Sequence, residues 1–388
     1  MAKTLLALAL AFAASVMVGA QSDLKTVCYY DSRAHWRHVL LGVGIWPSGV
    51  AGGLDPIDPD EPDYFASSEP YQTLIEDHEK RDAFVESARA LVRRANFDGI
   101  DLAWPFPKEP YKKDRGGTLG QWWHSVRRKF GSGRSDKKPE EDHVIRGRRE
   151  GFASLIREMK HAFSGGARPL KITVSHPPTT NITYFDVMSI SSMVEQIHVM
   201  GFDYITPFRQ KTQARQPAPL YVTDPTLSSA DATVRKWLSG GAPGRKLVLG
   251  IPAFGRTWRL PDGVEPAGAV PPATAEGPGG AGPHTNIYGL LAYYEICRNI
   301  THSGYDDWGL TNFPDPTRKM GPYATRVGSH EPLWVGYDDL DFAGAKATYV
   351  KSRGLGGVAM WDISLDDFGG VCTGTKFPLL RAIKAKLV

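Results

Sequence analysis

The sequence predicts an α/β barrel, because short apolar runs alternate along the chain with stretches of helical periodicity. The helical stretches place apolar side chains three or four residues apart, as in residues 84–92 and 152–163. This alternation is typical of parallel strands that are joined by crossover helices. We interpret seven apolar runs as barrel strands: residues 26–30, 39–45, 99–104, 170–174, 197–205, 247–254 and 357–363.

The connection between the first two runs is unusually short. A complete β/α barrel has about eight strands, whereas the sequence supplies seven runs. Only residues 31–38 separate the first two runs, but a parallel crossover needs roughly a dozen residues or more, usually including a helix. We therefore expect that these two strands are not direct neighbours in the barrel.

Residues 98–107, with the sequence DGIDLAWPFP, are predicted to form a strand with two different faces. One face carries its Ile, Leu and Trp side chains, which suit burial beneath helices. The other face carries Asp101, Ala103 and Pro105, which would point into the barrel. The C-terminal ends of the strands hold the active site in barrel enzymes, so the end of this strand is where chemistry is expected.

The N-terminal segment, residues 1–20, is typical of a cleavable secretory signal. Lys3 precedes an apolar run over residues 5–18, and the small residues Gly19 and Ala20 follow. The run is too short for a comfortable membrane span, and a buried N-terminal helix is the alternative. No other stretch is apolar enough to cross a bilayer, so we expect a secreted, extracellular protein.

The charge balance excludes an obligate nucleic-acid partner. The 46 basic residues minus the 42 acidic residues give +4, and loss of Lys3 with the signal lowers this to +3. A basic segment between residues 108 and 141 surrounds the aromatic cluster Trp122-Trp123-His124. We interpret it as a solvated loop, with a patch for an acidic, heparin-like glycan as the alternative. We expect no metal ion and no cofactor.

Three cysteines and two sequons bear on processing. Cys28, Cys297 and Cys372 leave one pair and one unpaired thiol in an oxidising compartment. The sequons Asn181-Ile182-Thr183 and Asn299-Ile300-Thr301 would be glycosylation acceptors where they are exposed.

The strand over residues 98–107 resembles the D-x-x-D-x-D-x-E signature of glycoside hydrolase family 18, the chitinase family. Asp98 and Asp101 match the first two acids, whereas Ala103 stands at the third and Pro105 at the catalytic glutamate. In this family the glutamic acid protonates the leaving oxygen, and an aspartate orients the substrate's own attacking acetamido group. The resemblance therefore implies a degenerate site with no catalytic residue, in which Asp98 and Asp101 are structural acids hydrogen-bonded inside the barrel.

The resemblance extends over nearly the whole mature chain and is strongest to the insect imaginal disc growth factors, which are secreted and catalytically silent. Residues 25–30, 247–256 and 356–368 look like the first, seventh and eighth family strands. The Asp-Leu-Ala-Trp variant of the motif and the insertion Gly-Gln-Trp-Trp-His-Ser at residues 120–125 point to this group. The chain departs from the group at Pro105, where glutamine is usual.

Compared with the family pattern, residues 31–38 join the first strand to what looks like the third. The resemblance thus implies that one βα unit near the N-terminus is absent, together with the usual partner of Cys28. It also implies a barrel over residues 21–257 and 340–388, with a small α+β subdomain inserted at residues 258–339.

Further residue roles and functions follow from the resemblance. It implies an aromatic sugar plate at Trp361, flanked by Met200, Asp203 and Arg256, although Trp361 as barrel core is the alternative. It also implies a disulfide that joins the second and third cysteines of the chain. The implied function is a growth-factor-like extracellular ligand, with a cell-surface receptor as partner. The alternatives are a lectin-like binder of chitin or chitooligosaccharides, and a splice or gene-model product that does not fold stably.

Overall fold

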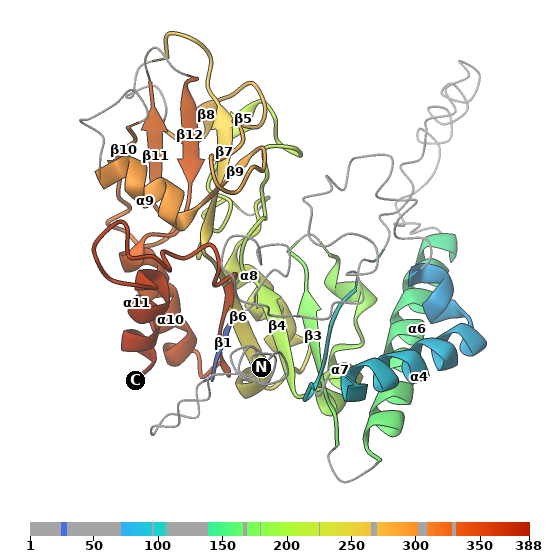
Figure 1. The fold of residues 1–388 in the computed structure, drawn as a ribbon. Helices are drawn as coiled ribbons and strands as arrows, with labels where there is room; N and C mark the ends of the chain where they lie inside the picture. The colour runs from blue at the N-terminus through green and yellow to red at the C-terminus, as the bar shows by residue number, and fades with distance from the viewer. Residues whose placement is uncertain are drawn as a thin grey trace, which may run out of the picture.

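The computed structural model contains a parallel sheet with helices outside it and a smaller antiparallel sheet beside it (Figure 1). The parallel sheet is six-stranded and the antiparallel sheet is five-stranded. The structure describes residues 25–28, 71–94, 97–104, 106, 139–165, 169–178, 180–224, 226–264, 270–301, 309–327 and 331–388.

The strands of the parallel sheet follow the order expected of a β/α barrel, with every neighbouring pair parallel. In spatial order they are β1 (Lys25–Cys28), β13 (Gly357–Trp361), β6 (Leu247–Pro252), β4 (Gln196–Met200), β3 (Lys171–His176) and β2 (Gly99–Ala103). Six of the seven predicted runs therefore contain strands. The remaining run, residues 39–45, and the join at residues 31–38 lie outside the described residues, so the absence of one βα unit stays a prediction.

One predicted strand is divided between the two sheets. Residues 247–254 were expected to form a single strand, but β6 ends at Pro252 and β7 (Phe254–Arg259) begins after Ala253. Proline has no N–H to donate to a further ladder bond. The Ala253 N–H instead donates to the Trp361 carbonyl at 2.7 Å, and its own carbonyl accepts the Tyr293 N–H at 3.0 Å. The chain thus passes from the barrel to the antiparallel sheet within a few residues.

The helices cover the outer face of the parallel sheet, as the apolar row of β2 requires. Trp104 is fully buried, and its ring lies 5.3 Å from that of Tyr71 and 5.4 Å from that of Phe152. Figure 1 shows α4 and α6 side by side at the β2 end of the sheet. The helices are α4 (His78–Arg94), α6 (Pro139–Phe163), η3 (Ile182–Tyr184), α7 (Val187–Met193), α8 (Ala230–Ser239), η4 (Gly244–Lys246), α9 (Tyr293–Thr301), α10 (Leu340–Ser352) and α11 (Pro378–Leu387).

The antiparallel sheet lies between β6 and β13 in the sequence and forms a small α+β unit with α9. Its aromatic core joins Trp258 and Trp334 edge to face at 5.5 Å, and Tyr323 stacks on Trp334 at 5.4 Å. In spatial order the strands are β10 (Thr311–Phe313), β11 (Tyr323–Arg326), β12 (Leu333–Gly336), β7 and β9 (Leu290–Ala292), while β5 (Gln213–Ala214) pairs with β8 (Ala273–Thr274).

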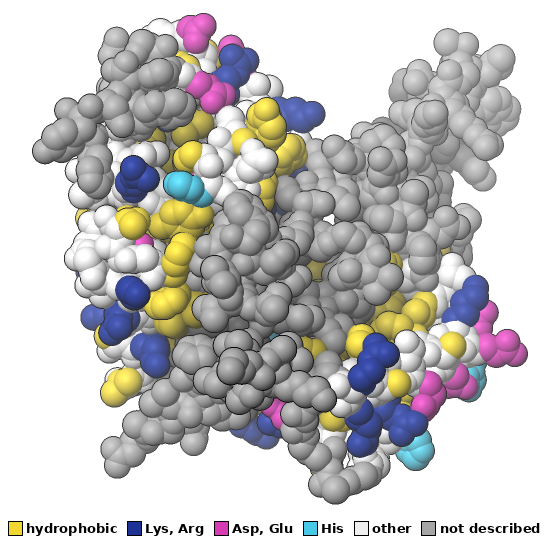
Figure 2. Space-filling view, viewed as in Figure 1, with side chains coloured by type: hydrophobic (Ala, Val, Ile, Leu, Met, Phe, Trp, Pro, Cys, Tyr) yellow, Lys and Arg dark blue, Asp and Glu magenta, His cyan; other side chains and the backbone are white. Residues whose placement is uncertain are grey.

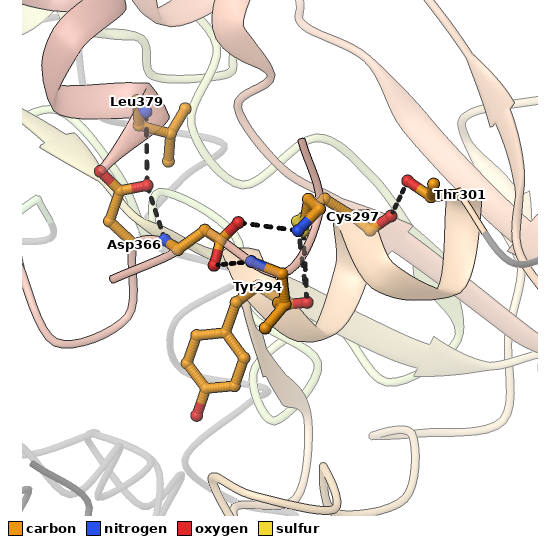
Figure 3. The surroundings of a disulfide bond; sticks show 8 residues. Tyr294, Cys297, Thr301, Asp366 and Leu379 are labelled. Carbon is orange, nitrogen blue, oxygen red and sulfur yellow. Dashed lines mark hydrogen bonds between the residues drawn. A yellow bond between two sulfur atoms is a disulfide. The ribbon is translucent and has the colours of Figure 1, made fainter. Parts of the chain in front are cut away.

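A disulfide ties this unit to the end of the barrel (Figure 3). It joins Cys297 of α9 to Cys372 in the loop after β13, the pair that the family resemblance implied. In the same region the buried Asp366 carboxylate accepts the N–H groups of Leu379 and Leu380, at 3.3 and 3.1 Å, in the first turn of α11. A carboxylate there also suits the positive end of the helix dipole.

The face in Figure 2 carries hydrophobic side chains at the surface between the antiparallel sheet and the C-terminal helices, with basic side chains beside them. Within the described ranges, no helix is both long enough and apolar enough to cross a membrane.

Candidate functional site

The inner face of β2 begins a polar network that crosses three strands of the parallel sheet. Thr173 and Ser175 of β3 donate hydrogen bonds to the two carboxylate oxygens of Asp101, at 2.5 and 2.7 Å. On β4, Nδ1 of His198 lies 3.2 Å from the same carboxylate. The side chain of Asp101 therefore holds neighbouring strands together, as expected of a structural acid inside a barrel.

The other motif positions lie elsewhere. Asp98 differs from the expectation, because it precedes the strand and its side chain is exposed rather than inside the barrel. Ala103 is the last residue of β2 and pairs in register with Ser175 of β3. It is therefore two positions nearer the C-terminal end of the strand than Asp101. Pro105 lies outside the described residues.

The residues predicted to bind sugar lie together at the C-terminal ends of three strands. The ring of Phe202, just after β4, lies 5.7 Å from that of Phe254 and 6.5 Å from that of Trp361. Met200 ends β4 and is buried, whereas Trp361 ends β13 and is only partly buried. The structure thus forms an aromatic wall at the barrel mouth, with Trp361 as its more exposed member.

Asp203 and Arg256 are bound to each other at this mouth. The guanidinium donates from Nε and Nη2 to the two carboxylate oxygens at 2.7 and 2.6 Å, which is the strong bidentate geometry. Arg256 also lies over the ring of Phe254, 5.0 Å from its centre, and Arg209 donates to the Asp203 backbone carbonyl. Both Asp203 oxygens act as acceptors in this pair. Nη1 of Arg256 is buried and has no hydrogen-bond partner among the described residues.

Two buried histidines on β3 and β4 were not singled out from the sequence: His176 lies on the outer face of β3, towards α8, and His198 lies on the inner face of β4. His176 ends β3, packs against Phe185 and Trp237, and its Nε2 lies 3.2 Å from the Thr180 carbonyl. Burial lowers the pKa of His176 to about 4, so its imidazole is neutral at physiological pH. His198 sits on the inner face of β4 beside Asp101. The alternation of side chains along the two strands is the signal for both: His198 shares the inner face with its register partner Ser175, and His176 takes the opposite face.

The processing sites differ in their surroundings. Asn181 is exposed, and its side-chain oxygen accepts the Thr183 N–H at 3.1 Å. Asn299 is partly buried in the last turn of α9. The basic segment at residues 108–138 lies outside the described residues, as does the side chain of Cys28.

This arrangement provides an aromatic wall and a hydrogen-bonded polar floor. Phe202 and Phe254 are buried, so Trp361 is the ring of this wall that is partly exposed, and its face suits a ligand with apolar ring faces. At the end of β2 the methyl group of Ala103 offers neither a proton nor a charge.

Comparisons with known proteins find relatives over most of the chain. Residues 64–366 match the family described as Glycosyl hydrolases family 18. The chain is 40% identical over 358 residues to the chitinase-like protein EN03 of Bombyx mori, covering 90% of this chain and 77% of that protein. It is 36% identical over 360 residues to the chitinase-like protein Idgf4 of Drosophila melanogaster, again covering 90% and 77%.

Solved structures give the same result for the fold. The group II chitinase catalytic domain 2 of Ostrinia furnacalis superposes with a TM-score of 0.65 at 30% identity, covering 83% of this chain and 75% of that chain. A variant of that domain, 29% identical with a TM-score of 0.64 over 83% and 75% of the chains, was solved in complex with (NAG)5. Human YKL-39, described as a pseudo-chitinase, superposes at 0.63 with 23% identity, covering 92% and 83%, and shows the likeness of fold alone.

Proposed function

The chain belongs to glycosyl hydrolases family 18, and we propose that it is a secreted, catalytically inactive member that acts as a growth-factor-like extracellular ligand. The observation that carries the loss of catalysis is Ala103, which ends the inner face of β2 where the family motif has an aspartate. Pro105 stands at the position of the catalytic glutamate, so the proton donor is absent as well.

The chemistry supports this assignment. General-acid catalysis contributes roughly 10²–10⁴-fold to a reaction rate, and proline has no proton to give. Asp101 is no substitute, because it lies about 7 Å deeper along the strand than Ala103 and four residues before the glutamate position, and it is already bound to Thr173 and Ser175. Alanine at position 103 leaves the acetamido group of a substrate without its orienting carboxylate.

Release of a fluorescent leaving group from a chitobioside, followed between about pH 4 and 8, tests this proposal. We expect no turnover above that of heat-denatured protein. The double substitution Ala103→Asp with Pro105→Glu serves as the comparison, with activity regained only if the surrounding residues still accept the substrate. Turnover of the unaltered protein near the usual enzyme range of roughly 1–10³ s⁻¹ would contradict the proposal.

The growth-factor-like role is supported by the insect relatives. Idgf4 of Drosophila melanogaster aligns with 90% of this chain. A ligand of this kind acts on cells through its surface, so its effect should not depend on the barrel mouth. Purified protein added to cultured insect cells is expected to raise their proliferation, and Trp361→Ala protein is expected to do so equally. No response at any dose, or a response lost with Trp361→Ala, would contradict a surface-acting ligand.

A lectin-like function is the second candidate, and the aromatic wall at the barrel mouth favours it. Phe202, Phe254 and Trp361 lie together there, and a 29% identical chitinase variant was solved with (NAG)5. Incubation with chitin beads separates the two candidates. Depletion of the unaltered protein but not of Trp361→Ala protein would favour the lectin. No depletion of either would leave the growth-factor-like ligand as the better description.

A further inference from the structure

A pocket lies between the antiparallel unit and the loop that follows β13, and no residue assigned to the barrel mouth lines it. Its volume is about 730 Å³, which is within the usual range of small-molecule sites. Leu291 of β9 and Leu333 of β12 form one side, and Phe368 and Val371 of the loop form another. Val371 is 56% exposed, so the pocket presents apolar surface to solvent.

One face of α9 forms the wall between these two sides. Tyr294, Glu295, Arg298 and Asn299 line the pocket. Tyr294 and Arg298 are four residues apart, as are Glu295 and Asn299, so the four side chains form two neighbouring rows on one side of the helix. Asn299 is also the acceptor residue of the second sequon. A glycan attached to this side chain would therefore begin at the pocket wall.

The walls are held in place without help from a ligand. The disulfide from Cys297 to Cys372 joins α9 to the loop, as Figure 3 shows. Glu295 accepts hydrogen bonds from the N–H groups of His284, Thr285 and Ala292, at 2.7 to 3.0 Å. Binding to a pocket that is already ordered loses little conformational entropy.

The lining chemistry suits a neutral, partly apolar ring. The charged groups are Arg298 and Arg326 against Glu295, Glu331 and Asp367, so two cations face three carboxylates and the net charge is only −1. Glu295 and Asp367 are committed to backbone N–H groups, which argues against a cation site.

The aromatic groups in the pocket complete this picture. The rings of Tyr294 and Phe368 meet edge to face at 5.6 Å. Aromatic side chains of this kind accept the apolar face of a sugar while leaving its polar groups to the rim.

We propose that Asn299 carries an N-linked glycan whose first acetamido sugars dock in this pocket. The inference rests on the proposed secretion, because the transferase acts in the secretory pathway. In the transfer, Nδ2 of Asn299 loses a proton and forms a bond to the anomeric carbon of a lipid-diphosphate-linked oligosaccharide. The bond from that carbon to the diphosphate breaks, and the lipid diphosphate leaves. Transfer precedes folding of α9, and docking follows it.

Asn181 provides an internal control. It is exposed, its side chain is held locally by the Thr183 N–H, and it does not line this pocket. A glycan there projects into solvent, whereas the glycan at Asn299 is partly covered by protein. The two sites should therefore differ in their access to an enzyme that removes glycans.

The experiment uses full-length protein secreted from insect cells and treated with a peptide N-glycosidase in its native state. Peptide mass spectrometry then follows removal at each site. We expect removal at Asn299 to be slower than at Asn181 by at least about tenfold, and to be equally fast after unfolding and reduction. Val371→Lys should speed removal at Asn299, whereas Val270→Lys should not, because Val270 is 58% exposed but does not line the pocket.

The possible outcomes distinguish glycan docking from the proposed secretion. Glycan at Asn181 alone overturns this inference and leaves the proposed secretion intact. Glycan at both sites with equal native removal rates overturns docking. Failure of the protein to appear in the medium, with both asparagines unmodified, overturns the inference and the secretion together. A slow native rate at Asn299 that Val371→Lys relieves supports docking in the pocket.

Discussion

The buried ion pair between Lys346 and Asp338 offers a sharp test of how this barrel is held together. Both side chains are 0% exposed, and Nζ of Lys346 lies 2.5 Å from Oδ2 of Asp338. Lys346 is in the middle of α10, and Asp338 lies in the short connection between β12 and that helix, so the pair fixes this connection against the helix. Burial raises the pKa of Asp338 to about 6 and lowers the pKa of Lys346.

Lys346→Met removes the positive charge and leaves a carboxylate buried without its partner. Breaking a buried pair in this way costs roughly 3–5 kcal/mol of unfolding free energy. The entropy of unfolding is about 0.8 kcal/mol/K for a chain of 388 residues, so the thermal midpoint should fall by about 4–6 °C at neutral pH. The double variant Lys346→Met with Asp338→Ala removes both charges and should recover much of this loss.

The loss should also depend on pH. In Lys346→Met the folded-state pKa of Asp338 rises still further above its unfolded value. The penalty is therefore fully present above the folded pKa and disappears as the pH falls and the carboxyl group becomes protonated. The midpoint difference from the unaltered protein should shrink between about pH 8 and pH 5.

Calorimetry measures the thermal midpoints of the unaltered protein, Lys346→Met and the double variant at about pH 8 and pH 5, with Arg318→Met as the matched control. Arg318 pairs with Asp341 at 2.7 Å, but both side chains are more than half exposed, and the midpoint should barely change. A Lys346→Met protein with an unchanged midpoint at both pH values would show that the pair does not stabilise the fold.

Three further predictions concern the disulfide, a buried acid and the N-terminal connection. Replacing Cys297 and Cys372 by serine should cost about 4.5 kcal/mol in the chain-entropy model for a separation of 75 residues, and peptide mapping should find Cys28 as a free thiol. Burial raises the pKa of Asp366 to about 6, so its ionisation opposes folding above that pH. Stability measured by denaturant should therefore rise as pH falls from about 7 to 5, and Asp366→Asn should flatten that rise. A relative that carries a full crossover in place of residues 31–38 should have a higher thermal midpoint and less self-association on size exclusion, because an open sheet edge invites pairing.

The alternation along β2 could be predicted from the sequence because the strand period does not depend on partners. Leu102 and Trp104 are buried and Asp101 faces inward, as the period of two requires. Asp98 was predicted less well, because the residue at which a strand begins is not encoded in its period. The division of residues 247–254 into two strands depends on Pro252 and on the sheet with which the following residues pair. The tertiary fold determines this pairing.

In the candidate site too, the sequence could predict which residues lie near one another but not which side chains bind each other. The family resemblance grouped Trp361 with Asp203 and Arg256, and the structure does bring them to one barrel mouth. The resemblance could not show that Asp203 and Arg256 form an ion pair with each other. They are 53 positions apart, and their relative geometry is set by β4 and β7. Similarly, His198 beside Asp101 follows from strand register, which a single sequence specifies only through its packing.

The persistence of Asp101 beside Ala103 has a physical explanation that does not involve catalysis. Asp101 binds side chains on two other strands, Ser175 on β3 and His198 on β4, so its loss would leave buried polar groups unsatisfied. The side chain at position 103 lies nearer the open end of the strand and has no such network to maintain. Substitution there therefore costs the barrel little, whereas substitution at Asp101 disrupts three strands at once. On this reasoning, the inner acid Asp101 holds the strands of this barrel together whatever side chain stands at position 103.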